Sequence, residues 1–154
     1  RIVVSTSGVP KIIKKMADDK VKFKLAVSLH SAVNETRTSI MPFNEKMNLD
    51  ELAEAMQYWY TKTKNIITYE YVVWKGINDK KEDINALIKF CKKAPSKVNL
   101  IQYNSIDDPN FVQASKIILE DYIRLLTSNK IKATIRRSRG QDIDAACGQL
   151  ANKN

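Results

Sequence analysis

The chain has 154 residues, of which 44% are hydrophobic and 28% are charged. This length suffices for one compact domain with a hydrophobic core but not for two sizeable ones. The composition is typical of a soluble globular protein and excludes a disordered chain. No apolar run reaches the length of a membrane-spanning helix and no signal-peptide pattern opens the chain, so we expect no membrane partner.

Lysine and arginine outnumber aspartate and glutamate by 26 to 17, which gives a net charge of +9. Such a surplus favours polyanionic partners, because contacts to phosphate release condensed counterions, but it does not identify the polyanion. The two cysteines, Cys91 and Cys147, are too few for a disulfide framework and predict a reducing, cytoplasmic setting. Neither belongs to a Cys-x-x-Cys pair, so the sequence by itself predicts no zinc or iron–sulfur site.

The first half of the chain predicts two strands and two helices. Ile2–Ser5 is predicted to be a buried strand, and a helix begins near Pro10, because proline fits the first turn of a helix. Phe23–Ser28 predicts a second strand. A long helix begins at Asn48, which with Glu51 three residues later forms a capping-box pattern. Its apolar positions recur at the spacing of one buried face and are Leu49, Leu52, Ala53, Met56, Trp59 and Tyr60.

The second half continues the alternation of strands and helices. Ile66–Trp74 is rich in β-branched and aromatic residues and predicts a third strand. A helix follows near Lys81–Ala94, with Cys91 on its apolar stripe, and stops before Pro95. The remaining predicted elements are a strand at Val98–Ile101, a helix at Val112–Ser128, a strand at Ile131–Ile135 and a short helix at Asp142–Leu150. This alternation predicts an α/β fold with a parallel sheet covered by helices.

Small polar residues follow the predicted strands. Ser5–Gly8 ends the first strand, Ser28–His30 ends the second, and Asn104 follows the fourth. Ligands of parallel α/β folds bind beyond the carboxyl ends of the strands, so these residues predict a ring of hydrogen-bonding groups around one mouth. Each residue alone also has a purely structural explanation, His30 as a local hydrogen-bonding group and Ser5 as a turn residue.

Five motifs together resemble one known family. They are Ser5–Pro10, Ser28–His30, Met41–Asn44, Asn99–Ile101 with Asn104, and Arg139–Leu150 (Arg-Gly-Gln-Asp-Ile-Asp-Ala-Ala-Cys-Gly-Gln-Leu). In this order they resemble the radical SAM RNA methyltransferases that methylate C2 of an adenine in 23S rRNA and, in some members, in tRNA. The resemblance covers essentially the whole chain, and its last motif is long and chemically unusual, which makes it specific.

The resemblance implies a partial (β/α) barrel of the radical SAM type. It assigns the first four predicted strands to the barrel and residues 131–154 to an accessory strand and catalytic tail. In the family, a loop with three cysteines that bind a [4Fe–4S] cluster precedes these strands, and this loop is not in the sequence. The chain begins at Arg1, and we expect it to be the C-terminal portion of a longer enzyme and to be inactive alone.

The resemblance also implies the cofactors and their contacts. S-adenosylmethionine (SAM) contacts map onto Ser5, Ser28, Leu29, His30 and Asn104. Short donors and acceptors at strand ends suit the amino-acid head, ribose hydroxyls and adenine edge of SAM. The [4Fe–4S] cluster would be held by residues outside this sequence, and the longer protein would need a reductant such as flavodoxin.

Cys147 matches the methyl-carrying cysteine of the family. The resemblance implies that one SAM methylates its sulfur, that a radical from a second SAM removes a hydrogen from this methyl group, and that the resulting carbon radical adds to adenine. In the family a second cysteine resolves the protein–RNA link, and Cys91 does not match its position. Without the resemblance, Asp142 and Asp144 would raise the pKa of Cys147 and favour a buried structural role. Gln141 departs from the aspartate common in the family.

The arginines near the start of this motif and the net positive charge are the features that predict RNA binding. Arg136, Arg137 and Arg139 predict contacts to RNA phosphate, against the alternative of a solvated charged stretch. Two further functions stay open: an adenine-C8 rRNA methyltransferase, which shares the motifs, and a non-catalytic basic RNA-binding module. A redox role for Cys147 is weaker, because no partner cysteine is near in sequence. We also expect this chain to self-associate through exposed strand edges.

Overall fold

The five strands form one sheet in a computed structural model that describes residues 2–102 and 110–137. The strands follow chain order across the sheet, and every neighbouring pair is parallel. They are β1 (Val3–Thr6), β2 (Lys24–Ser28), β3 (Ile67–Val72), β4 (Ser96–Gln102) and β5 (Lys132–Arg137). The predicted α/β class with a parallel sheet is confirmed.

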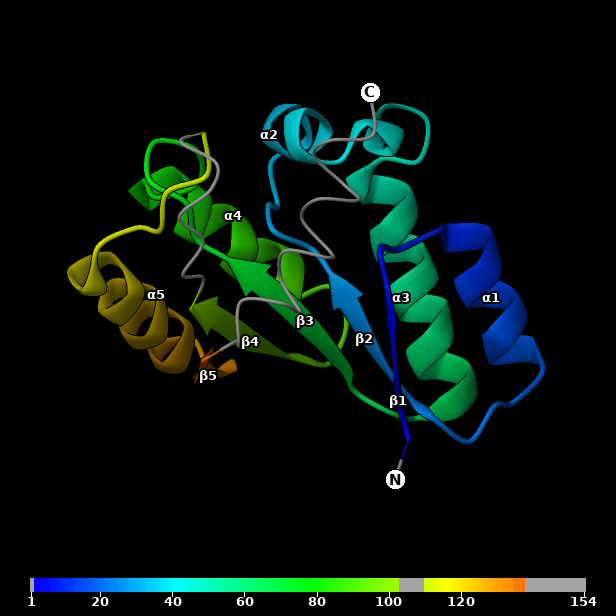
Figure 1. Ribbon diagram of the computed structural model, residues 1–154. Coiled ribbons are helices and arrows are strands. Elements are labelled where there is room, and N and C mark those ends of the chain that lie inside the picture. Colours follow the sequence, from blue (N-terminus) through cyan, green and yellow to red (C-terminus); the bar gives the residue numbers. More distant parts are fainter. Residues whose placement is uncertain (1, 103–109, 138–154) are drawn as a thin grey trace.

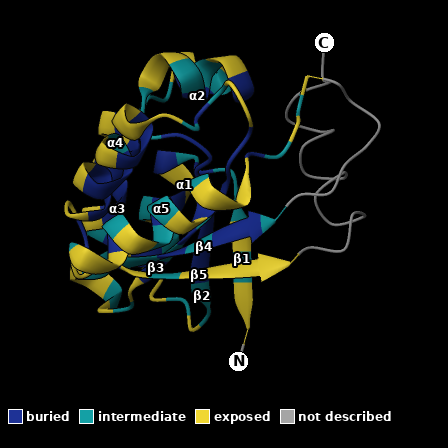
Figure 2. Cartoon of the chain, turned by 90° about the vertical axis from the view of Figure 1, so that its left-hand side faces the viewer, coloured by how far each residue is buried: buried dark blue, intermediate teal, exposed yellow. Residues whose placement is uncertain are grey.

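Helices connect the strands and pack on one face of the sheet (Figures 1 and 2). They are α1 (Pro10–Asp18), α2 (Asn34–Ile40), the short 3-10 helix η1 (Pro42–Glu45), α3 (Leu49–Thr63), α4 (Lys81–Cys91) and α5 (Lys116–Ser128). Helix α1 packs against α3, and α4 packs against α5. Helix α2 and η1 lie above the carboxyl ends of the strands (Figure 1). Within the described ranges, no helix is long and apolar enough to cross a membrane.

Three details differ from the sequence-based prediction. Helix α2 and η1 were not predicted, because their sequences are mostly polar and lack an apolar period. The last described helix begins at Lys116 rather than Val112, because the Ser115 hydroxyl caps it by accepting the Ile118 N–H at 3.4 Å. The first strand was predicted to be buried, but Val3 is 56% exposed because β1 is an edge strand.

One large hydrophobic core lies between the sheet and the helices. Strand residues at alternate positions enter it, among them Leu25, Val27, Tyr69, Tyr71, Val98 and Leu100. Trp59 is fully buried there, which confirms the predicted apolar face of α3, and Tyr60 is half-buried. Cys91 is a core residue, as predicted, and burial raises the pKa of its thiol to about 12. This thiol is therefore protonated near neutral pH and is a poor nucleophile.

The other face of the sheet carries a row of polar side chains. Ser28, Glu70, Asn99 and Thr134 are register partners across β2, β3, β4 and β5. The Thr134 hydroxyl donates to Asn99 Oδ1 at 3.0 Å. The helices described above pack on the opposite face (Figure 2). This row therefore runs across the sheet from Ser28, at the carboxyl end of β2, to Thr134 in β5, on the face that the helices leave open.

Candidate functional site

The segment Ser28–His30 ends β2 and turns the chain sharply. Leu29 is buried and still belongs to the ladder, because its N–H donates to the Glu70 carbonyl at 3.0 Å. His30 has a φ of +57°, and the Ser31 N–H donates across it to the Leu29 carbonyl at 2.7 Å. A positive φ costs a non-glycine residue about 1–3 kcal/mol, so it persists only where the surroundings fix it.

Three contacts fix His30. Its Nδ1 accepts the Val72 N–H at 3.0 Å, and its carbonyl accepts from Asn78 Nδ2 at 2.7 Å. Its ring lies 5.5 Å from the Trp74 ring, centroid to centroid. Burial, reinforced by the charge of Arg37, lowers the pKa of His30 to about 3. The imidazole is therefore neutral at physiological pH and, because Nδ1 is an acceptor, carries its proton on Nε2.

The buried guanidinium of Arg37 connects the ends of β1 and β2. Its Nε donates to the Leu29 carbonyl at 3.0 Å, and its Nη2 donates to the carbonyls of Ser28 at 3.1 Å and Ser7 at 2.9 Å. Its Nη1 donates to Asn44 Oδ1 at 3.0 Å. These four partners are neutral oxygens, and the residue is 0% exposed. Burial lowers the pKa of Arg37 to about 10, which leaves it charged at neutral pH.

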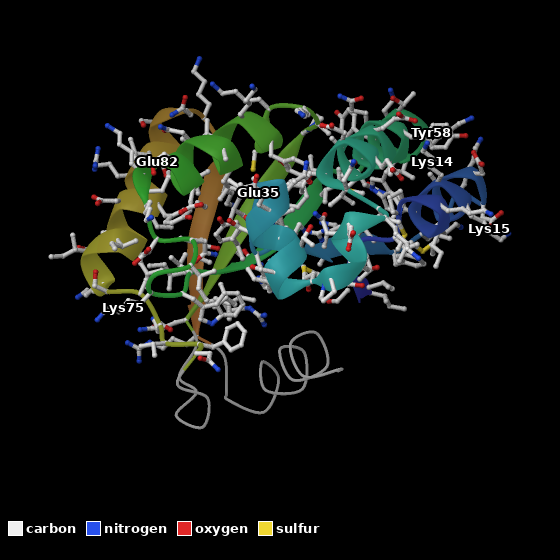
Figure 3. The ribbon with its side chains drawn as sticks, turned by 90° about the horizontal axis from the view of Figure 1, so that it is seen from above. Lys14, Lys15, Glu35, Tyr58, Lys75 and Glu82 are labelled. Carbon is white, nitrogen blue, oxygen red and sulfur yellow. The ribbon has the colours of Figure 1, made fainter. Side chains whose placement is uncertain are left out.

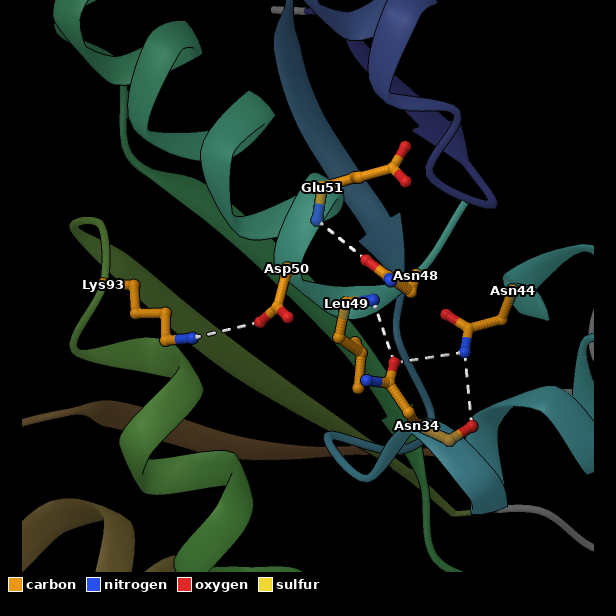
Figure 4. A network of polar contacts seen from close by, with 7 residues as sticks. All are labelled: Asn34, Asn44, Asn48, Leu49, Asp50, Glu51 and Lys93. Atoms are coloured by element: carbon orange, nitrogen blue, oxygen red, sulfur yellow. Dashed lines mark hydrogen bonds and ion pairs between the residues drawn. The ribbon is translucent and has the colours of Figure 1, made fainter. Parts of the chain in front are cut away.

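Asn44, which accepts a hydrogen bond from Arg37, belongs to a network of hydrogen bonds that reaches the beginning of α3 (Figure 4). Its Nδ2 donates to the Asn34 carbonyl at 3.2 Å and to Asn34 Oδ1 at 3.3 Å. The same Asn34 Oδ1 accepts the Leu49 N–H at 3.0 Å. Asn48 Oδ1 accepts the Glu51 N–H at 3.1 Å, which confirms Asn48 as the N-cap of α3. The loop above the strand ends is thus tied to a long core helix.

The loop after β1 lies beside this network. Ser5 pairs with Ala26, which puts it on the same face of the sheet as Ser28. The Gly8 N–H donates to Thr6 Oγ1 at 3.1 Å, and Gly8 has a φ of +95°. A Cβ at Gly8 would lie 3.1 Å from a core leucine methyl group and 3.5 Å from the Arg37 guanidinium. Glycine therefore allows the two strand ends to approach each other.

Two of the three arginines predicted to contact RNA lie on β5, at the opposite edge of the sheet from β1. Arg136 and Arg137 end β5 and are exposed. Arg136 Nη2 lies 3.7 Å from Glu70 Oε2. Burial raises the pKa of Glu70, while Arg136 and a hydrogen bond from Asn99 oppose that shift. Arg136 therefore lies near a carboxyl group on the polar face of the sheet. Among the described residues, no ion pair of Arg137 is seen.

The structure places four of the predicted SAM contacts, Ser5, Ser28, Leu29 and His30, towards the carboxyl ends of the neighbouring strands β1 and β2, with the Leu29 side chain in the hydrophobic core. Three other predicted site residues, Asn104, Arg139 and Cys147, lie outside the described residues, as does the predicted helix at 142–150. The sequence reasoning missed Arg37 and Asn78. Arg37 lies in a short polar helix and Asn78 in the loop after β3, and neither position has an apolar period. The Met-Pro-Phe-Asn motif at 41–44 gave a signal near Arg37 but none near Asn78.

The described residues fit SAM better than a metal cluster. No group of three or more histidine, cysteine, aspartate or glutamate side chains in residues 2–102 and 110–137 could hold a metal ion. The serine hydroxyls and the neutral His30 imidazole are short hydrogen-bonding groups at adjacent strand ends. A neutral histidine also avoids repulsion of the sulfonium cation of SAM.

Comparison with solved structures defines the class of fold. A radical SAM methyltransferase from Sphaerobacter thermophilus matches with a TM-score of 0.87 and 37% identity, over 97% of this chain and 44% of that chain. A domain of pyruvate-formate lyase-activating enzyme from Bacteroides vulgatus matches with a TM-score of 0.65 and 16% identity, over 87% of this chain and 80% of that chain, which shows the fold alone. The sheet and helices therefore form the radical SAM type of α/β fold.

Sequence relatives narrow the class. The chain is 69% identical over 153 residues to a protein named probable dual-specificity RNA methyltransferase RlmN from Flavobacterium psychrophilum. It is 64% identical over 154 residues to the protein of the same name from Christiangramia forsetii. These matches cover 99% and 100% of this chain but 44% of each relative. No family model matches the chain. The relatives confirm the predicted resemblance to the radical SAM RNA methyltransferases, over a chain that spans less than half of their length.

Proposed function

We propose that this chain is the C-terminal portion of a radical SAM enzyme that methylates C2 of an adenine in 23S rRNA and in tRNA. The observation that carries the proposal is the 69% identity, over 99% of the chain, to a relative named for dual-specificity RNA methylation. The buried polar segment at the end of β2 supports it, because ligands of parallel α/β folds bind at that edge. The proposed setting is the cytoplasm.

SAM and a [4Fe–4S] cluster would together supply the radical chemistry when bound. In this chain Ser5, Ser28 and His30 would hold SAM through their side chains, with Leu29 between them and Asn104 completing the site. The cluster ligands would come from a part of the enzyme outside this sequence, as would the docking site of a reductant such as flavodoxin. The role of the described residues is to bind and orient SAM and to exclude water.

RNA would approach the end of the sheet that leads into the catalytic tail. Arg136, Arg137 and Arg139 would contact phosphates beside the target base, because the base must reach Cys147. Basic side chains lie far apart on the molecule: Figure 3 shows Lys15 and Lys75 at opposite ends. The net charge of +9 would therefore attract RNA generally, while the arginines fix its position.

Peptide mapping of Cys147 tests the proposed mechanism. The longer protein that contains this chain would be purified from cells, alongside its Cys147→Ala variant. We expect a methyl or methylene adduct on Cys147 and complete loss of RNA methylation in the variant, since the other cysteine of the sequence, Cys91, is buried in the core. Cys91→Ala is the matched control and should keep the activity, because Cys91 is buried in the core.

An unmodified Cys147 thiol in an active, cluster-loaded and SAM-exposed enzyme would contradict the methyl-carrier role. RNA binding that falls steeply with salt and does not depend on Cys147 would then favour the basic RNA-binding module. Mass spectrometry of nucleosides from the modified RNA separates the two methylation sites. We expect 2-methyladenosine, and 8-methyladenosine would identify the chain with the C8 enzymes instead.

We further expect the 154-residue chain to be inactive alone and to self-associate through β1. Ile2 and Val3 are 71% and 56% exposed beside this edge strand, and unpaired edges recruit other strands. Light scattering should show oligomers that Val3→Lys reduces. Ile117→Lys removes an equally exposed apolar side chain from α5 and should leave the association unchanged. A monomeric wild-type chain at moderate concentration would disprove the edge pairing.

A further inference from the structure

We propose that Arg37 and Asn78 are positioning residues that hold the backbone of Ser28–His30 in its ligand-binding conformation. The inference rests on the proposed function, because it assigns Ser28–His30 to SAM. Neither residue touches that ligand in the proposal. Each acts through the backbone carbonyls of the segment that does.

Three consecutive carbonyls in this segment each accept a hydrogen bond from one of these two buried side chains. Arg37 Nη2 donates to the Ser28 carbonyl at 3.1 Å, and Arg37 Nε donates to the Leu29 carbonyl at 3.0 Å. Asn78 Nδ2 donates to the His30 carbonyl at 2.7 Å. With these oxygens occupied, a ligand at the strand end meets the side chains of the segment rather than its backbone acceptors.

The conformation of His30 explains why these three hydrogen bonds to the backbone are needed. A histidine with a φ of +57° relaxes towards negative φ unless its surroundings oppose the change. Relaxation would move the carbonyl away from Asn78 and the imidazole away from the Val72 N–H, which now lies 3.0 Å from Nδ1. The backbone conformation therefore also determines that Nδ1 is the acceptor of the Val72 N–H and that Nε2 carries the proton.

Both positioning side chains are themselves anchored to distant elements. Asn78 Oδ1 accepts the Trp74 N–H at 2.7 Å, and the Asn78 carbonyl accepts the Tyr122 hydroxyl of α5 at 2.6 Å. Arg37 reaches Ser7 after β1 at 2.9 Å and Asn44 at 3.0 Å. Because a guanidinium presents its donors in a fixed planar fork, it can hold two strand ends in one geometry, which a lysine cannot do.

Two variants and one control test the proposal, in the 154-residue chain for the state of His30 and in the longer protein that contains it for SAM binding. Arg37→Lys keeps the positive charge but loses the fork, and Asn78→Ala removes the donor to His30. The control is Ile67→Val at the amino end of β3, a fully buried position far from the carboxyl ends of the strands. Thermal midpoints are recorded for all proteins, so that loss of stability can be separated from loss of positioning.

The first readout is the imidazole of His30, the single histidine of the chain, observed by long-range 1H–15N NMR. The wild type and Ile67→Val should show one tautomer with the proton on Nε2. Arg37→Lys and Asn78→Ala should show mixed tautomers and exchange of the Val72 amide at least about 10-fold faster than in the control. The second readout is a titration of the longer, cluster-loaded protein with SAM, in which both variants should weaken binding about 10-fold or more and the control less than about 2-fold.

Retention of the single tautomer and of wild-type SAM affinity in Arg37→Lys would overturn the proposal, as would equal losses in Ile67→Val. If Asn78→Ala does not fold, Arg37→Lys still decides the outcome. A longer, cluster-loaded wild-type protein whose SAM titration shows no binding, combined with altered tautomers in the variants of the 154-residue chain, would support the positioning roles and refute the SAM assignment. The two failures are therefore distinguishable.

Discussion

Replacing Arg37 by methionine is expected to lower the free energy of unfolding by about 3–5 kcal/mol, because several buried acceptors lose their donor at once. Methionine fills a similar volume without a polar group, so the loss comes mainly from hydrogen bonds. The carbonyls of Ser7, Ser28 and Leu29 and the Asn44 side chain would each lose a donor. A buried acceptor without its donor costs about 1–3 kcal/mol before the structure relaxes.

Urea unfolding of the two proteins at pH 7 measures this effect. Arg124→Met is the matched control, because Arg124 lies on the surface of α5 and its ion pair with Asp121, at 3.2 Å, is exposed. Its loss should change the stability by about 0.5 kcal/mol or less. A loss below about 1 kcal/mol in Arg37→Met would show that water or backbone movement satisfies the freed carbonyls.

Acid should destabilise the chain through His30. Burial, with Arg37 as the second cause, lowers the pKa of His30 from 6.5 to about 3 in the folded state. The unfolded chain therefore binds a proton below about pH 6.5 that the folded chain rejects. The stabilising contribution is fully present above pH 6.5 and is lost as the pH falls towards 3. Between pH 7.5 and pH 5 the expected loss is about 2 kcal/mol.

The difference between the wild type and His30→Gln isolates this contribution. Burial raises the pKa of Glu70 and of Asp83, and a carboxyl group with a raised folded pKa adds stability as the pH falls. These groups are common to both proteins, so they cancel in the comparison. Glutamine can keep a hydrogen-bonding group without titrating. Parallel pH profiles of the two proteins would contradict the buried, neutral state of His30.

The sequence alone predicted the α/β class with its parallel sheet, which the structure confirms, and placed the candidate site at the carboxyl ends of the strands. The alternation of apolar runs with amphipathic segments predicts parallel strands and crossover helices, because each period matches one kind of buried face. Ser28–His30 could be placed at a ligand-binding edge for the same reason, since the carboxyl ends of parallel strands share one edge. The polar pattern of α2 gave no such signal, and its position depends on tertiary hydrogen bonds.

Only the tertiary structure decided which residues hold this site together. Arg37 reaches Ser7 across 30 residues of sequence, and Asn78 reaches His30 across 48. Neither pairing has a local periodicity, because a hydrogen bond between loops depends on where the strands end in space. The charge state of His30 was equally hidden, since it follows from burial and from the Val72 N–H at Nδ1. A sequence orders residues along the chain, whereas desolvation and hydrogen bonding depend on the neighbours that folding brings together.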